Sequence, residues 1–248
     1  MRKVVICNFK GGVGKTTCAV NLSVGLARAR RKVLLIDNDA QASATDAIST
    51  DNTGSSGTYG LIVKSETPKK VAVKIEKGFD LIPASRALAN VDQWLTTRIR
   101  REEILKKRLE KLTGYDFVII DTAPSFSLLN LNALTFASEV WIPASMEYLA
   151  LQGVKQVIDS LDMIKDELDH DLAIKYVIPT FYDTRNSKTK AVIQALKDSF
   201  GKSVTTPIRT NVKLSEAPSH HISIFDYASA SAGAEDFKKL VRRIAKDG

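Results

Sequence analysis

Two lysines lie in one short glycine-rich stretch, "NFKGGVGKTT", which runs from residue 8 to residue 17. Glycines at this spacing let backbone N–H groups converge on phosphate oxygens, and the helical pattern that follows adds the positive end of a helix dipole. The lysine of such a loop reaches the β- and γ-phosphates, and the hydroxyl beside it binds Mg²⁺. Lys15 and Thr16 fit these two roles, so we expect a nucleoside triphosphate to bind here.

The first half of this loop departs from the usual pattern, G-x-x-x-x-G-K-[ST]. Phe9 stands where that pattern has its first glycine, and Lys10 beside it is a second lysine in a loop that ordinarily needs one. The remaining positions keep the glycine-rich character. We therefore expect phosphate contacts from the rest of the loop, at Gly11, Gly12, Val13, Gly14 and, beside the α-phosphate, Thr17.

Three carboxylates follow two of the apolar runs in the chain. Asp37 and Asp39 end "VLLIDND", and Asp121 ends "YDFVIID", which has the form of a Walker B motif. Ligands bind at the carboxyl ends of the strands in open α/β sheets, so these side chains are candidates for binding the metal. The alternative for Asp37 and Asp39 is that they are simply turn residues. The spacing of Asp121 after a phosphate loop favours a role at the metal.

Strands and helices that alternate along the chain have to position these residues. Continuously apolar runs predict strands covered on both faces, at Lys3–Cys7, Lys32–Ile36, Phe79–Ile82, Phe117–Ile120, Val140–Ile142 and Ile174–Ile178. Amphipathic patterns predict helices at Cys18–Ala29, Arg98–Leu112, Leu149–Leu168 and Lys188–Phe200. The turn-rich segment Thr50–Thr58 predicts an exposed loop. The fold expected is α/β, a doubly wound, mostly parallel sheet flanked by helices, in a single domain over residues 1–248.

The composition of the chain indicates the compartment in which the protein works and the class of molecule that it binds. Thirty-six Lys and Arg against 28 Asp and Glu give a formal net charge of +8 and a pI near 9.4. A basic surplus favours a polyanionic partner such as nucleic acid or an anionic membrane. No apolar run approaches the roughly 20 residues of a membrane span, and Val4–Ile6 is too short for a signal peptide. Cys7 and Cys18 form no metal or disulfide pattern, so we expect a soluble protein of a reducing cytoplasm.

The motifs together resemble those of the ParA/MinD superfamily of ATPases. "FKGGVGKTT" matches the deviant Walker A box of that family, and "VLLIDNDAQASAT" is similar to its second motif, LLIDxDPQGNAT, with Ala40, Ala42 and Ser43 as departures. Four later segments resemble ParA/Soj-type sequences in the expected order: "FDLIPASRALAN", "IPASMEYLALQGV", "FYDTR" and "NVKLSEAPS". The resemblance covers nearly the whole chain and implies a P-loop NTPase of the deviant Walker A type.

This resemblance implies an ATP-dependent homodimer in which the nucleotide is sandwiched between two subunits. In the family the early lysine, here Lys10, contacts phosphates bound to the partner subunit, rather as an arginine finger does. Lys10 and Lys15 would then both serve catalysis, and each would bind nucleotide. Glu147 would meet the edge of the partner's nucleotide, and Phe181 would flank the adenine.

The resemblance also assigns roles to the carboxylates. Asp39 would position the attacking water, and Asp37 would lie near the metal. Asp121 would hold Mg²⁺ directly or through water, together with Thr16. ATP and Mg²⁺ are thus the expected cofactors, and the expected activity is a slow hydrolysis of ATP that a ParB-like or other cargo-bound adaptor stimulates.

The resemblance further implies that the dimer binds DNA non-specifically and positions a cargo on the nucleoid. Two basic positions of Soj-like proteins correspond to Arg185 and Lys213 here, and Arg209 lies near the second of them in sequence. The match is to the short ParA type, without an N-terminal DNA-binding region, and so predicts no operator-specific repression.

Other readings remain open. A basic amphipathic C-terminal segment, with Phe237, Leu240, Val241 and Ile244 at helical spacing, either packs on the domain or binds a membrane as in the MinD branch. We expect packing, and membrane binding is the alternative. The charged segment Arg98–Leu112 is a surface helix or an addition to a DNA-binding face. A metabolic or metal-transfer enzyme on the same fold is the other alternative class.

Overall fold

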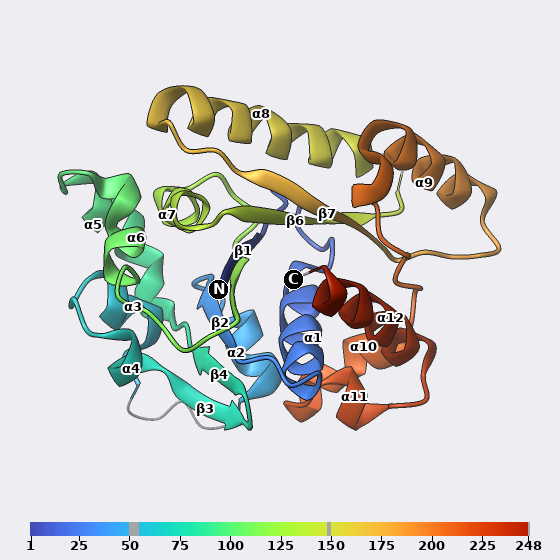
Figure 1. Ribbon diagram of the computed structural model, residues 1–248, viewed down its shortest axis with the longest axis horizontal. Coiled ribbons are helices and arrows are strands. Elements are labelled where there is room, and N and C mark those ends of the chain that lie inside the picture. Colours follow the sequence, from blue (N-terminus) through green and yellow to red (C-terminus); the bar gives the residue numbers. More distant parts are fainter. Residues whose placement is uncertain (50–54, 148–149, 248) are drawn as a thin grey trace.

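The computed structural model describes residues 1–49, 55–147 and 150–247, and it contains a seven-stranded sheet covered by helices on both faces (Figure 1). The strand order is β3-β4-β2-β5-β1-β6-β7, and every neighbouring pair is parallel except β3 with β4. The strands are β1 (Arg2–Ile6), β2 (Val33–Asn38), β3 (Val73–Glu76), β4 (Phe79–Ile82), β5 (Phe117–Thr122), β6 (Glu139–Ser145) and β7 (Ala173–Thr180). The predicted doubly wound α/β fold is confirmed.

Helices fill most of the connections between these strands. The α-helices are α1 (Lys15–Arg28), α2 (Ser43–Ile48), α3 (Gly57–Ile62), α4 (Pro68–Val71), α5 (Val91–Thr96), α6 (Ile104–Arg108), α7 (Leu128–Phe136), α8 (Ala150–Leu168), α9 (Ser187–Phe200), α10 (Val212–Glu216), α11 (Ile224–Tyr227) and α12 (Ala232–Lys246). Short 3₁₀ turns are η1 (Arg86–Asn90), η2 (Arg101–Glu103), η3 (Gly201–Ser203) and η4 (Ala217–His220). The prediction at 149–168 is matched by α8 except at Leu149, which lies outside the described residues.

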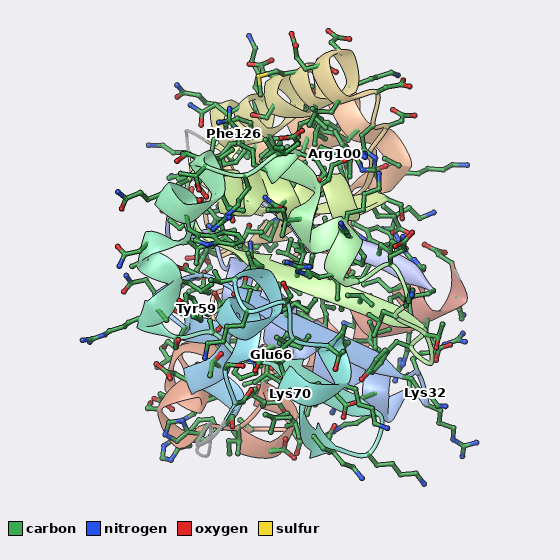
Figure 2. All side chains as sticks on the ribbon, turned by 90° about the vertical axis from the view of Figure 1, so that its left-hand side faces the viewer. Lys32, Tyr59, Glu66, Lys70, Arg100 and Phe126 are labelled. Carbon is green, nitrogen blue, oxygen red and sulfur yellow. The ribbon has the colours of Figure 1, made fainter. Side chains whose placement is uncertain are left out.

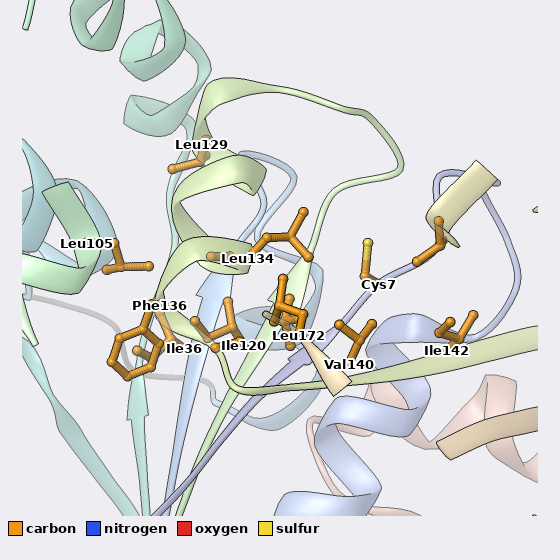
Figure 3. Close-up of a cluster of buried hydrophobic side chains, with 14 of the residues drawn as sticks. Cys7, Ile36, Leu105, Ile120, Leu129, Leu134, Phe136, Val140, Ile142 and Leu172 are labelled. Carbon is orange, nitrogen blue, oxygen red and sulfur yellow. The ribbon is translucent and has the colours of Figure 1, made fainter. Parts of the chain in front are cut away.

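Alternate residues of the central strands enter two hydrophobic cores, one on each face of the sheet. In β2, Leu34 and Ile36 belong to the core that also contains residues of α3, α5, α6, α7 and α8, whereas Val33 and Leu35 belong to the core that contains residues of α1 and α12. Figure 3 shows the first core, where Ile36 and Ile120 from the strands lie near Phe136 from α7. Side chains alternate across a strand, so a strand covered on both faces has to be continuously apolar.

Two predictions about individual elements are wrong, at least in part, and one strand was missed. Arg98–Leu112 is not one helix, because Arg100 takes a left-handed φ of 51° and the chain turns before η2 and α6. Ile99 is therefore 94% exposed and does not join the apolar stripe. The loop expected at 50–58 falls partly on residues 50–54, outside the described part, and α3 already begins at Gly57. β3 was not predicted, because this antiparallel edge strand is only partly buried and its sequence alternates.

The C-terminal segment packs on the sheet as expected. Phe237, Leu240, Val241 and Ile244 are all buried against the core that contains α1. None of the described helices is long and apolar enough to cross a membrane. Arg2, at the start of β1, donates hydrogen bonds to Glu139 and to the carbonyl of Ile244, which ties the end of α12 to the beginning of the sheet.

Candidate nucleotide site

The glycine-rich stretch forms the loop between β1 and α1, at the carboxyl end of the sheet. Gly12 and Gly14 have φ of 71° and 87°, values that side chains with a Cβ rarely adopt, and Gly14 directly precedes the first turn of α1. The loop borders a cavity of about 410 Å³. From elsewhere in the chain its walls include Asp39, Ser43, Thr122, Pro124, Phe181 and Pro218.

Lys15 lies in this cavity as a largely buried cation. Its Nζ donates to the carbonyl of Lys10 at 3.2 Å, and its relative exposure is 7%. Burial lowers the pKa of Lys15, and the nearby Asp121 carboxyl opposes that shift. An anionic ligand at the loop would compensate the buried ammonium, so this environment favours phosphate binding.

Asp37 and Asp121 lie opposite each other on the adjacent strands β2 and β5. Oδ2 of Asp121 accepts a hydrogen bond from the Thr16 hydroxyl at 2.7 Å, and Oδ2 of Asp37 accepts from the backbone N–H and hydroxyl of Thr45. Burial, followed by the repulsion of Asp37, raises the pKa of Asp121 to about 8. Burial also raises the pKa of Asp37 to about 6. Two buried carboxyls side by side therefore need a proton or a cation.

The residues present fit Mg²⁺. Within the described part of the chain, no group donates a hydrogen bond to Oδ1 of Asp121, although this atom is buried. A hard cation takes carboxylate and hydroxyl oxygens, and Mg²⁺ commonly uses one or two carboxylates together with phosphate oxygens. Thr16 and Asp121 could supply such oxygens beside the phosphate loop, whereas both oxygens of Asp37 already accept hydrogen bonds from Asp39 and Thr45. That these residues hold the metal stays a prediction.

We expect Asp121→Asn to stabilise the metal-free, nucleotide-free protein at pH 8. Because the pKa of Asp121 is raised, the folded state keeps a proton that the unfolded chain loses above its ordinary value of about 3.9. The resulting stability is complete below that value and is lost as the pH rises toward 8. The neutral amide has no such dependence, so its advantage should grow by about 3 kcal/mol between pH 5.5 and pH 8.

Urea denaturation with a chelator at both pH values measures this difference. Asp46→Asn, at an exposed position on α2, is the matched control and should behave as the wild type. An advantage of Asp121→Asn that does not change with pH would contradict the raised pKa.

Lys10 lies on the outer side of the loop. Its Nζ forms an ion pair with Oε2 of Glu147 at 2.6 Å, and the two side chains are 32% and 67% exposed. Next to it, the ring of Phe9 meets that of Phe126 edge to face, with centroids 5.6 Å apart. Lys10 and Glu147 were both predicted from the sequence. The aromatic pair was not, because Phe126 belongs to the loop after β5 and nothing in the spacing links it to Phe9.

Phe181 stands between the phosphate cavity and a second, more apolar cavity of about 250 Å³. The side chain is 47% exposed, and the backbone has a φ of 54°. The second cavity is also lined by residues that sequence analysis did not assign: Thr180, Ile208, Thr210, Asn211, Val212 and Leu214. Its place beside Gly14 and Phe181 suits a flat base attached to phosphates in the first cavity.

The three positions proposed for DNA binding differ in their surroundings. Arg185 is 89% exposed and pairs with Asp183 at 3.1 Å, and Lys213 pairs with Glu216 at 2.8 Å. Exposed ion pairs of this kind contribute little, so both cations can exchange their partners for phosphates. Arg209 is held by Asp236 and the neighbouring Glu235, and it also donates to the carbonyl of Ala232. These hydrogen bonds and ion pairs attach the Arg209 side chain to the first turns of α12.

Comparison with known proteins identifies relatives over the whole chain. The family described as an AAA domain matches residues 1–174. The sporulation initiation inhibitor protein Soj of Bacillus subtilis is 38% identical over 99% of this chain and 98% of its own length. The chromosome partitioning protein ParA of Caulobacter vibrioides is 36% identical over 98% and 94%. A structure of cobyrinic acid a,c-diamide synthase from Mycobacterium smegmatis, with a bound ATP analogue and magnesium, has a TM-score of 0.84 at 29% identity, covering 99% of this chain and 95% of the other.

Proposed function

The chain belongs to the ParA/Soj family of ATPases, and from this premise we propose that ATP and Mg²⁺ join two copies into a sandwich dimer that binds DNA non-specifically. A cargo-bound, ParB-like adaptor stimulates slow hydrolysis in this dimer. Hydrolysis then releases the DNA. Cycles of binding and release would position a cargo on the nucleoid.

The observation that carries this proposal is the separation of the two lysines of one loop. Lys15 is buried inside the phosphate cavity, whereas Lys10 reaches outward to the exposed Glu147. A cation on the outer side of the loop suits a nucleotide bound by a second subunit, because a triphosphate enclosed between subunits carries more charge than one loop neutralises.

The decisive experiment measures binding to a non-specific DNA duplex with ATP, with ADP and without nucleotide, at two salt concentrations. We expect ATP to strengthen binding, salt to weaken it and Lys10→Ala to remove the ATP-dependent part. The Lys10→Ala monomer should still bind ATP, because Lys15 and the glycines remain. If ATP strengthened DNA binding by Lys10→Ala as much as binding by the wild type, Lys10 would have no role in forming the dimer.

Arg185→Ala combined with Lys213→Ala separates the DNA contact from dimerisation. The double variant should form the ATP-dependent dimer but bind the duplex at least about tenfold more weakly, with a shallower salt dependence. Sedimentation with ATP and a DNA titration check the two halves of this prediction. Unchanged DNA affinity would place the contact on another surface.

A MinD-like membrane ATPase is the alternative from sequence. Its membrane contact would need the apolar face of α12, but Phe237 and Leu240 are buried in the core. Exposing them would remove well-packed side chains, which costs several kcal/mol. The packing of α12 therefore supports DNA rather than a membrane as the surface on which the dimer acts.

A further inference from the structure

The turn and short helices between α5 and β5 concentrate positive charge away from the nucleotide site. Residues 98–111, "RIRREEILKKRLEK", contain seven Lys or Arg against three Glu, a net charge of +4 out of the chain's +8. These residues lie on the flank seen in Figure 2, where Arg100 is labelled. A groove of about 970 Å³ crosses this flank, and Trp94, Arg98, Arg100, Lys106, Lys107 and Arg108 contribute to its walls.

Several of these cations are available to a ligand. Arg98, Arg101 and Lys107 are exposed, and within the described part of the chain none of them forms an ion pair. The Arg98 guanidinium lies 4.4 Å from the centroid of the Trp94 ring, which holds the side chain in place but leaves its charge uncompensated. Lys106 is only loosely paired, at 4.0 Å from Glu103.

The turn that carries the arginines is held in one shape. The backbone N–H of Arg98 donates to the carbonyl of Leu95, and that of Glu103 donates to Arg100, whose φ is 51°. From α7, the Asn132 side chain accepts from Leu105 and donates to the carbonyl of Arg101. The fold therefore uses a buried asparagine to fix a turn whose side chains point to solvent.

Ile99 is at the tip of this turn and is 94% exposed, more than any other large hydrophobic side chain in the described residues. Arginines flank it on both sides in the sequence. Many proteins that bind the DNA minor groove combine these two features, because arginine is attracted to the negative potential of a narrow groove and an apolar wedge enters between base steps.

We propose that residues 98–111 form a second, weaker DNA-binding surface, which binds duplex without nucleotide at low salt and inserts Ile99 into the minor groove. This surface shares its ligand, DNA, with the function proposed above but does not otherwise depend on that function. The surface belongs to a single subunit and contains no residue of the phosphate loop, so it needs neither ATP nor dimerisation. An acidic protein segment would also match the charge. Arg100 is paired with Glu103, but Arg98 and Arg101 beside one exposed apolar tip favour the duplex.

The test uses the Lys15→Ala protein, which is not expected to bind ATP, and a 30-base-pair duplex labelled with fluorescein. Arg98→Ala/Arg101→Ala/Lys107→Ala in this background should weaken binding at least tenfold. The slope of log affinity against log salt should fall by about two to three, since each lost phosphate contact removes about 0.9. Lys69→Ala/Lys77→Ala/Lys238→Ala removes the same charge from exposed positions on other elements and should have a much smaller effect.

Ile99→Ala distinguishes a wedge from a purely ionic contact. It should weaken binding several-fold and leave the salt slope unchanged, because an apolar side chain releases no counterions. Arg185→Ala/Lys213→Ala should retain nucleotide-independent binding. The proposal is overturned if the two triple variants lose affinity equally, if Ile99→Ala binds as the wild type does, or if the nucleotide-free protein does not bind duplex at low salt. Because the ATP-dependent binding is measured with Lys15 intact, it can fail independently of this surface.

Discussion

Lys15→Ala should lower the affinity for ATP at least about a hundredfold, which corresponds to about 2.7 kcal/mol. Lys15 is 7% exposed in the phosphate cavity, and its ammonium is available there for charge-assisted hydrogen bonds to phosphate. No other described lysine lines this cavity, because Lys10 pairs with Glu147 on its outer side. Titration with a fluorescent ATP analogue measures the loss directly.

Two controls make this result specific. Thermal unfolding without nucleotide should show that Lys15→Ala remains folded, since burial lowers the pKa of Lys15 and the empty protein gains little from its charge. Lys10→Ala should bind ATP nearly as the wild-type monomer does. ATP affinity retained by a folded Lys15→Ala protein would refute the assignment of the phosphate loop.

Asp39→Ala should lower the rate of ATP hydrolysis by about a hundredfold or more, the usual range for loss of a residue that activates the attacking water. Asp39 borders the phosphate cavity and is half-buried, with its carboxylate accepting a hydrogen bond from the N–H of Gln41. Asp37, two residues earlier, retains its bonds to Thr45 in this variant. ATP binding should therefore persist, and the ATP-bound dimer should accumulate.

Phosphate release and size-exclusion chromatography with ATP check the two parts of this prediction. Asp46→Ala is the matched control, because it removes an exposed carboxylate from the neighbouring α2. Normal hydrolysis by Asp39→Ala would remove this residue from the mechanism. Loss of ATP binding would instead assign it to the binding of metal or phosphate.

Structural elements were predicted correctly from the sequence where a single physical requirement determines the residue type. Strands buried on both faces must be continuously apolar, so β1, β2 and β5 could be predicted from their apolar runs. The carboxylates Asp37 and Asp121 were predicted with them, because they lie at the ends of β2 and β5. The edge strand β3 was not predicted, because one of its faces is exposed to solvent and its sequence is therefore not continuously apolar. Arg98–Leu112 had helical periodicity, but a single left-handed residue at Arg100 divided it.

Parts of the site that depend on tertiary contacts were less visible in the sequence. Phe9 and Phe126 lie far apart in the chain and meet only after β1 and β5 pair. The walls of the second cavity include the end of β7 and residues 208–215. Part of this stretch belongs to the family-like segment "NVKLSEAPS", but the resemblance did not indicate that it lines a cavity. Arg209 was predicted to bind DNA because of its charge, but its acidic neighbours on α12 could not be read from its own segment.

The bond from Arg2 to the carbonyl of Ile244 has a practical consequence for imaging and protein engineering. It brings the beginning of β1 and the end of α12 together, at the opposite end of β1 from the phosphate loop (Figure 1). A fluorescent reporter joined to either end of the chain through a flexible linker would leave from this side of the subunit. Such fusions should keep the nucleotide face accessible, provided that Arg2 is retained.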